Sequence, residues 1–448
     1  MTVSRRNLLA GSLAGAAMAA TPARARPLGT HGLDAATLGV RAGSPDDQTA
    51  KLQRAIDRAA QMRAPLMLAP GRYRAGHLTL RSGSQIVGVR GATVIALTRG
   101  PALLQAEHGE ALTLSGLTLD GGAKALPENH GLVHLTDVRK LRISDCKIVR
   151  AGGNGIALHG CDGVVTLTTI SDAADNALFS NDSRGLIVTG NTIRKSGNGG
   201  IRIWQSERRS DGSLVADNRI EDTRARVGGT GQNGNAVNIF RAGDVTVRSN
   251  VIRNAAFTAI RGNSASNLQI IGNNCAGLDE VALYVEFSFE NAVVADNIVD
   301  GAGVGVSVTN FKEGGRLASV RGNILRNLSL RMPGQPPESQ GVGVSVEADT
   351  AVAGNVIETA STAGITLGWG QYLRNVAVTG NVVRTAGIGI AVSVVAGAGD
   401  AVISGNMIAG ARRGAILGME WHKPVSADLA KDGAAPYPQL TVADNKVS

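Results

Sequence analysis

Aromatic residues are scarce in this chain, and their scarcity restricts the kind of core that it can build. Phe, Trp and Tyr make up 3% of the 448 residues, whereas glycine occurs 59 times. This balance is typical of thin stacked repeats joined by many tight turns, which grow without a single globular core. We therefore predict one long domain in place of two or three ordinary ones.

Cysteine is equally scarce, which argues against a disulfide framework or a thiolate metal site. Cys146, Cys161 and Cys275 show no CxxC or Cys/His spacing, and the seven histidines show no ligand spacing on one strand face. Cys275 stands where other repeats carry Ile, Val or Leu, so we expect a small buried apolar side chain there. We predict no metal and no cofactor; calcium is conceivable but has no sequence support.

Lysine is the third shortage, with 9 of the 45 basic residues. The arginine guanidinium binds both oxygens of a carboxylate, which the lysine ammonium does not do as well. The excess of arginine therefore suggests an acidic polymer as partner, unless it reflects only a GC-rich genome. Basic residues form no run longer than a pair, as at Arg208-Arg209 and Arg412-Arg413. We expect no nucleic-acid partner.

One short phrase recurs along two thirds of the chain: a small or acidic residue, then Asn, then a branched apolar residue two places on. Successive asparagines are mostly 23 to 27 residues apart, with two steps of 32 and a last one of 39. Such a period indicates a solenoid. The ten positions are Asn191, Asn218, Asn250, Asn273, Asn297, Asn323, Asn355, Asn381, Asn406 and Asn445.

This period fits three short strands per coil, because the segments alternate apolar and polar residues between Gly, Asn and Asp turns. The predicted fold is all-β: a right-handed, single-stranded parallel β-helix. Coils stack at about 4.8 Å, so equivalent side chains form columns. An Asn at the same turn of every coil then bonds the turn backbone and its neighbours above and below.

The N-terminal sequence resembles an export signal of the twin-arginine type. Arg5 and Arg6 precede Asn7-Leu8-Leu9, a mildly apolar stretch from Ala10 to Ala20 and an A-x-A cleavage site after Ala25. We predict that residues 1–25 are removed, that the twin-arginine translocase is a transient partner, and that the mature protein is periplasmic or secreted. No stable membrane anchor is expected.

Residues 26–80 are predicted to hold a capping helix and the first strand, with β-helix repeats over 81–448. The helix opens near Ser44-Pro45-Asp46-Asp47-Gln48, and Leu52, Ala55, Ile56 and Ala59 follow helical spacing. Leu78 to Leu80 is the expected first strand. An amphipathic helix here shields the open end of the stack.

Asp46-Asp47-Gln48 and the phrase Leu68-Ala69-Pro70-Gly71-Arg72-Tyr73 resemble the start of pectate-lyase-like β-helix proteins. Together with the signal and the Gly-Asn repeats, the whole chain is similar to uncharacterised twin-arginine-translocated repeat proteins. The resemblance implies the β-helix fold and, by analogy of fold alone, work on polysaccharides.

A second recurring phrase, Gly-Ile-x-Ile, places candidate site residues on one outward face. Ile201 and Ile203 point inward, so Arg202 and Trp204 point outward. Aligned strands give two outward columns, which gather aromatic, basic and acidic groups in a chain that has few aromatics. The columns are Ala157, Leu178, Arg202, Asn238, Arg261, Tyr284, Ser307 and Ser345, and beside them His159, Ser180, Trp204, Phe240, Asn263, Glu286, Thr309 and Glu347.

The two long repeats place their extra residues at Asp222 to Asn235 and at Leu328 to Gly341. Both insertions fall between the Asn turn and the Gly-Ile strand, so we expect both loops to emerge on one edge and wall a groove across this face.

We predict that this face binds an acidic polysaccharide. Aromatic rings stack on sugars and Arg forks pair with uronate carboxylates. The predicted substrate-binding residues are Arg202, Trp204, Asn238, Phe240 and Asn263.

If the protein is an enzyme, lyase or C5-epimerase chemistry is favoured. In that case Arg261 neutralises the carboxylate, and Tyr284 transfers the proton with a pKa lowered by the arginines. Glu286 orients both groups.

Two alternatives stay open. One is a non-catalytic polysaccharide-binding or envelope structural protein, which needs the same groove without acid and base. The other is a polygalacturonase-like hydrolase, but Glu286 and Glu347 lie two coils apart, about 10 Å, and Asn176 replaces the second acid near Asp175.

Overall fold

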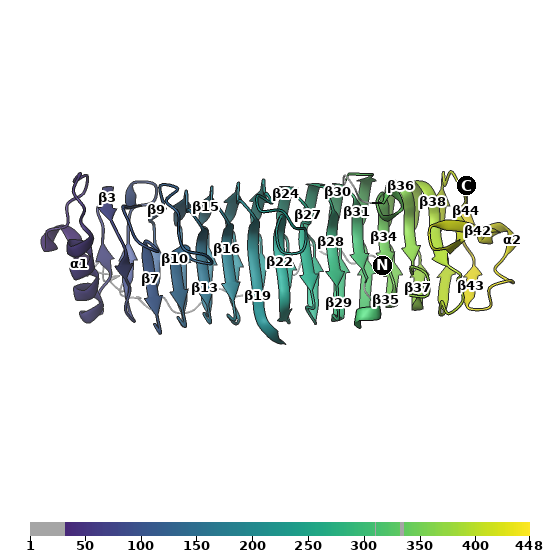
Figure 1. The fold of residues 1–448 in the computed structure, drawn as a ribbon, viewed down its shortest axis with the longest axis horizontal. Helices are drawn as coiled ribbons and strands as arrows, with labels where there is room; N and C mark the ends of the chain where they lie inside the picture. Colours follow the sequence, from purple (N-terminus) through teal and green to yellow (C-terminus); the bar gives the residue numbers. More distant parts are fainter. Residues whose placement is uncertain (1–31, 310, 332–335) are drawn as a thin grey trace, which may run out of the picture.

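The computed structural model describes residues 32–309, 311–331 and 336–448. Short parallel strands lie side by side along one axis, with helix α1 (Thr49–Gln61) at one end and α2 (Leu429–Asp432) at the other (Figure 1). The predicted all-β, right-handed parallel β-helix with an N-terminal helix is confirmed. Arg5 and Arg6, the predicted signal motif, lie outside the described residues.

Each coil contributes three strands. One face is a 16-stranded sheet that runs from β1 (Leu33–Asp34) to β43 (Leu440–Ala443). The other two faces form a single 28-stranded sheet, because long strands such as β36 (Val356–Leu367) and β38 (Val382–Ser393) continue from one face into the next. Strands of neighbouring coils pair in parallel and in register, as in the pair of β28 (Val281–Glu286) with β31 (Val304–Val308).

Helix α1 buries Leu52, Ala55, Ile56 and Ala59 against the first coil, as their spacing predicts. The helix begins later than expected, at Thr49, whose backbone N–H donates to Asp47 Oδ1 at 2.9 Å. Pro45 therefore lies before the helix and outside its first turn.

The first coil also begins earlier than predicted. Strands β1, β2 (Leu66–Met67) and β3 (Gly71–Ala75) all precede Leu78. Leu78–Thr79 does form a strand, β4, but the prediction that it is the first strand is wrong. The reason is that short strands paired to later coils need little local sequence signal, because their partners supply the pairing.

The asparagine column is continuous and buried. Asn273 Nδ2 donates to Val247 O and to Asn297 Oδ1, each at 3.0 Å, while its own Oδ1 accepts from the backbone N–H and Nδ2 of Asn250. The same pattern repeats from Asn191 to Asn445. Each side chain within the column thus bonds buried groups of the coil before it and of the coil after it, which fixes the register of the stack.

Toward the N-terminus the column changes residue type but keeps its role. The backbone N–H of Thr168 donates to Asn191 Oδ1, and the backbone N–H of Cys146 contacts Thr168 Oγ1 at 3.4 Å. Burial raises the pKa of the Cys146 thiol to about 11, so it is a neutral packing group. Cys275 is fully buried among apolar side chains, as predicted.

Replacing Asn273 with Ala is expected to destabilise the protein by about 2–4 kcal/mol, because the N–H groups of Asn250 lose their acceptor inside the stack. Chemical unfolding followed by circular dichroism measures this loss. Asn445→Ala is the matched control, since the column ends there and Asn445 is half-buried. An equal loss in both variants would contradict a cooperative column.

Candidate functional site

The register of the strands defines the outward columns. The first contains Ala157, Phe179, Arg202, Asn238, Arg261, Tyr284, Ser307, Ser345, Thr366 and Ala391. Leu178 and Ser180, which we predicted in these columns, are wrong by one residue. They pair with Ile201 and Ile203, and both are fully buried. A shift of one residue along a strand exchanges its two faces, so Phe179 and Asn181 take the outward positions.

The N-terminal half of this face carries a chain of aromatic rings. His130 stacks on His134 with centroids 4.2 Å apart, and His134 lies 5.3 Å from His159. Ring contacts of 5.5 to 5.7 Å then continue along the axis, through Phe179, Trp204 and Phe240. The predicted residues Trp204 and Phe240 therefore sit side by side and half-buried, within a packed aromatic strip.

The insertion between Glu221 and Asn235 lies across the face instead of walling it. Backbone carbonyls of three consecutive loop residues accept hydrogen bonds from three consecutive strands. Arg261 Nη1 donates to Thr230 O at 2.6 Å, Asn238 Nδ2 to Gly231 O at 3.1 Å, and Arg202 Nη2 to Gln232 O at 2.8 Å. We call residues 228–233 the strap.

Under the strap, Arg202, Asn238 and Arg261 are buried, with 3 to 7% of their surface exposed. Asn238 Oδ1 also accepts from Trp204 Nε1 at 2.9 Å. The predicted substrate-binding residues Arg202, Trp204 and Asn238 thus lie together, and other protein groups bond their polar atoms, except for Arg202 Nε.

A charged cluster lies next to the residues under the strap, on the side toward Tyr284. Arg261 Nε donates to Glu286 Oε1 at 2.6 Å, and its Nη1 lies 3.7 Å from Glu280 Oε2. Asn263 Nδ2 also donates to Glu286 Oε1 at 3.0 Å, and the Arg261 guanidinium lies over the Tyr284 ring. The three predicted catalytic residues, Tyr284, Arg261 and Glu286, therefore form one connected group, joined by Glu280, which we did not predict.

Burial, more than charge, sets the protonation of this cluster. It raises the pKa of Tyr284, and the neighbouring Glu286 carboxylate raises it further, because both disfavour a phenolate. The predicted net lowering of the Tyr284 pKa is therefore wrong: Arg261 does lower this pKa, but burial and Glu286 outweigh its effect. Burial likewise raises the pKa of Glu280, against the opposing effect of Arg261. Tyr284 and Glu280 are suited to donate protons rather than to accept them.

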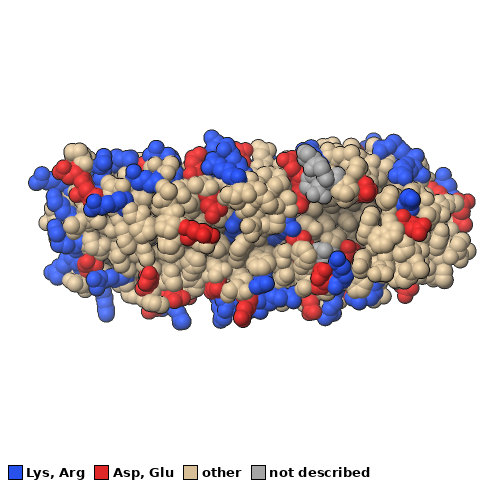
Figure 2. Space-filling view, in the orientation of Figure 1, with Lys and Arg blue, Asp and Glu red and all other residues tan. Residues whose placement is uncertain are grey.

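Beyond Tyr284 the same columns form the floor of a groove of about 770 Å³ (Figure 2). It spans the strands from β28 and β31, through β34 (Val342–Val346), β36 and β38, to β41 (Ile416–Glu420). Its axis follows the solenoid, over about 19 Å between Tyr284 and Ala391 at about 4.8 Å per strand. The cavity is therefore long and narrow, and it crosses the strands.

The floor combines an apolar strip with a row of hydroxyls. Val281, Val304 and Val342 pack together at the bend of their coils, with Tyr284 against them. In the next column the hydroxyls of Ser307, Ser345 and Thr366 follow Tyr284. Sugar rings present apolar C–H faces and hydroxyl edges, which such a floor complements.

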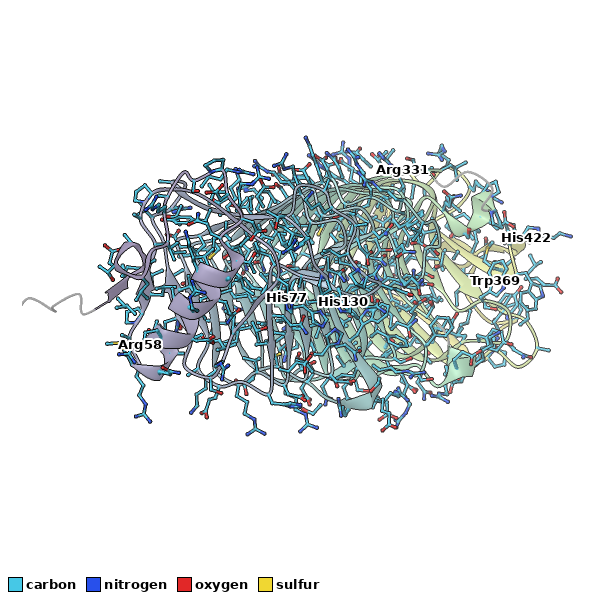
Figure 3. All side chains as sticks on the ribbon, turned by 60° about the vertical axis from the view of Figure 1, so that its left-hand side comes forward. Arg58, His77, His130, Arg331, Trp369 and His422 are labelled. Atoms are coloured by element: carbon cyan, nitrogen blue, oxygen red, sulfur yellow. The ribbon has the colours of Figure 1, made fainter. Side chains whose placement is uncertain are left out.

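The second insertion borders this groove, as predicted, through Pro337 to Gln340 and the short 3-10 helix Pro337–Ser339. At the opposite side and C-terminal end stand two tryptophans, Trp369 and Trp421. Their centroids are 5.6 Å apart, their planes are tilted by 72°, and 43% and 46% of their surfaces are exposed. Trp369 and His422 lie together at this end of the solenoid (Figure 3).

Local structure holds both rings at the rim. A tight turn pairs Trp369 with Tyr372, and Ser393 Oγ donates to the carbonyl of Gly370 at 2.6 Å. Gly370 has a φ of 58°, and a Cβ there would lie 2.4 Å from the Trp421 ring, so only glycine admits that ring. This pair was not among the residues predicted from the sequence, although two of the three tryptophans follow the second insertion.

Charges in the groove are mainly acidic. Glu280, Glu338 and Glu347 line it, whereas Arg413 is the one arginine or lysine among its described lining residues. Over the part of the chain that the structure describes, no three His, Cys, Asp or Glu side chains gather to hold a metal ion. Within the same residues, no helix is long and apolar enough to cross a membrane.

Comparison with known proteins assigns the family. The family described as right-handed beta helix region matches residues 111–220 and 209–383, more than half of the chain. The protein therefore belongs to the right-handed β-helix family. No curated protein matches the sequence significantly.

Solved structures share the fold at low identity. The catalytic unit of the GH87 α-1,3-glucanase from Streptomyces thermodiastaticus matches with a TM-score of 0.51 and 15% identity, over 96% of this chain and 70% of the glucanase. Pre-mature gene product 12 of bacteriophage phi29 matches with a TM-score of 0.53 and 12% identity, over 86% of this chain and 65% of that one. These similarities show the fold alone, and the site has to indicate the function.

The mannuronan C-5 epimerase AlgE6 A-module of Azotobacter vinelandii reaches a TM-score of 0.41 at 14% identity, over 93% of this chain and 99% of the module. At that score it carries no weight for the epimerase prediction.

The histidine stack makes stability depend on pH. Burial, then His130 and His159, lower the pKa of His134 to about 4, while Glu107 opposes this weakly. A lowered pKa means that the contribution to stability is complete above about pH 6.5 and is lost as the pH falls toward 4. Acidification to pH 5 should therefore remove about 2 kcal/mol.

His134→Phe, which keeps a ring in the strip, should flatten this dependence between pH 7.5 and 5 in thermal unfolding. His422→Phe, at an exposed position, is the control and should leave it unchanged. A His134→Phe protein with the same pH slope as the wild type would refute the assignment.

Proposed function

We propose that this protein binds an extended polysaccharide chain along the groove between Tyr284 and Trp421. The observation that carries the proposal is the pair of exposed tryptophans at the end of a narrow groove with an apolar and hydroxyl-lined floor. Exposed indoles are unusual in a chain with 3% aromatics, and aromatic faces stack on sugar rings. The axial direction of the groove suits a polymer, because successive strands repeat similar contacts.

The polymer in this segment need not be acidic. Arg202 and Arg261, on which we based an acidic partner, lie under the strap or in ion pairs, and acidic side chains predominate in the groove. A neutral or sparsely charged sugar segment suits the groove better, since carboxylates repel uronates.

We also propose that the protein is exported from the cytoplasm. The support for export is the Arg5-Arg6 phrase with its apolar stretch and cleavage site. A periplasmic or secreted binding protein would meet such polymers in the envelope or outside the cell.

A second candidate function is catalytic. Tyr284 and Glu280 line the groove, and the raised pKa of each keeps a proton available there. A lyase and a hydrolase both protonate a leaving oxygen, whereas an epimerase returns a proton to the C5 carbon, so a proton donor in the groove suits one step of each reaction. The base or nucleophile of such a reaction is not assigned.

Trp369→Ala and Trp421→Ala are each expected to weaken polysaccharide binding by about tenfold, because each removes a stacking face of roughly 1 kcal/mol or more. Calorimetric titration against an α-glucan, a β-glucan and polygalacturonate measures this effect. Leu167→Ala, at an exposed apolar position outside the groove, is the control. Unchanged affinity in both tryptophan variants would rule out the groove as the binding site.

Tyr284→Phe separates binding from chemistry. If the groove is catalytic, the variant should retain affinity and lose turnover, since only the proton is removed. Reducing ends, unsaturated products and viscosity report turnover on the same polymers. Turnover equal to that of the wild type would exclude Tyr284 as the proton donor, and its absence in the wild type would favour the binding protein.

A further inference from the structure

The column that floors the groove does not stop at Tyr284. It continues through Arg261, Asn238 and Arg202, one strand at a time, in unbroken register. From Arg202 to Ala391 it spans about 34 Å at about 4.8 Å per strand. The strap covers only its N-terminal part, so the same axial track is open over one segment and closed over the next.

The strap lies on this track as an extended polymer would. Its successive carbonyls at Thr230, Gly231 and Gln232 accept from three successive strands, so its contacts follow the solenoid axis. These hydrogen bonds are ones that the oxygens of a bound sugar chain would also make. The strap thus occupies the hydrogen-bond donors that a bound sugar chain would use.

The strap leaves the hydrogen-bonding groups of Arg202 only partly satisfied. The side chain is 7% exposed, and it forms no ion pair with any described residue. Its Nη2 donates only to neutral oxygens, Gln232 O and Asn233 Oδ1, and its buried Nε has no partner. A buried guanidinium without a carboxylate is costly, and burial lowers the pKa of Arg202 to about 10.

The edge of the Arg202 guanidinium that contains the unpaired Nε has the geometry to bind a carboxylate. Nε and Nη2 form one side of the guanidinium fork, which binds both oxygens of a carboxylate in parallel. Gly199 lies next to this edge, and a Cβ at that position would come within 3.0 Å of Nε. Glycine therefore adds no side chain of its own beside Nε, although Asn176 Oδ1 lies 2.4 Å from the same Cβ position.

The strap has the features of a loop that a ligand can displace. It is glycine-rich, with positive φ at its first two residues, Gly228 and Gly229, and at Gly234 just beyond it. Val227, the one large apolar residue of the insertion, is 71% exposed, so little apolar surface holds the loop down. Hydrogen bonds that a ligand can replace are its main contacts with the face.

We propose that the strap occupies a second binding segment of the groove, in which Arg202 pairs with the carboxylate of a uronic acid unit once the strap is displaced. This inference rests on the proposed function, because it extends the same polymer track. It divides the track into an open segment for uncharged sugar units and a covered segment that selects an acidic one. Displacement replaces two neutral acceptors on Arg202 with a charged one.

The test removes the strap at matched coil length. Deleting residues 225–233 leaves four residues between Glu221 and Asn235, the same number as between Arg194 and Gly199 in the preceding coil. Calorimetric titration then compares polygalacturonate, dextran and dextran sulfate on the wild type and the deletion protein. The deletion should strengthen polygalacturonate binding about tenfold or more and leave dextran unchanged, because a charge-assisted fork replaces loop contacts.

Arg202→Gln in the deletion background should abolish that gain, whereas Arg194→Gln, which removes one charge from a surface ion pair, should preserve it. Unchanged polygalacturonate affinity after the deletion would overturn the inference. An equal gain for dextran sulfate would also overturn the carboxylate assignment, since it would show a response to charge alone.

Should the deletion protein fail to fold, Asn233→Ala in the full chain serves instead. It removes the Oδ1 acceptor of Arg202 and the hydrogen bond to Gly228 O. Hydrogen exchange of residues 224–234 should then increase when polygalacturonate is added, and unchanged exchange at saturating polymer would refute displacement. Failure of the proposed function looks different: no polymer would bind to any variant, and the tryptophan substitutions would have no effect.

Discussion

The asparagine column is the constraint on which the rest of the structure depends. Parallel coils can slide by one residue at little local cost, and such a slip would exchange the buried and exposed faces of a strand. The column prevents the slip, because an Asn side chain within it bonds the coil before and the coil after at once. Every outward column, including the one that floors the groove, inherits its alignment from these bonds.

From that alignment follows a surface with two different halves. Toward the N-terminus, rings from His130 to Phe240 pack on one another, and the strap seals the polar groups beside them. Toward the C-terminus the same columns carry small hydroxyl residues, which leave space above the sheet. Side-chain size along one column thus decides where the face is filled and where it is hollow.

The repeat predicted the fold, the capping helix and most of the register from sequence. It failed at Leu178 and Ser180, where Asn176-Ala177-Leu178 imitates the Gly-Ile-x-Ile phrase one residue out of step. It failed again at β1 to β3, short strands that are defined by their pairing with the next coil. Local pattern specifies a strand, but only the stacked neighbours specify which residue faces out.

The candidate site was less predictable. Arg202, Arg261, Tyr284 and Glu286 do share a face, yet the path of an irregular glycine-rich loop cannot be read from periodicity, and that path buried the arginines. The expected lowering of the Tyr284 pKa failed for the same reason, since it assumed a solvated face. Trp369 and Trp421 lie in connections outside the repeat phrase, where a repeat-based alignment has no position for them.

The central claim is that this face binds a polymer parallel to the solenoid axis. A crystal structure of the protein with a bound oligosaccharide tests it most directly. We expect sugar rings in line from Tyr284 toward Trp421, with an indole stacked on at least one of them. Sugar bound across the axis, or on the 16-stranded face, would contradict it.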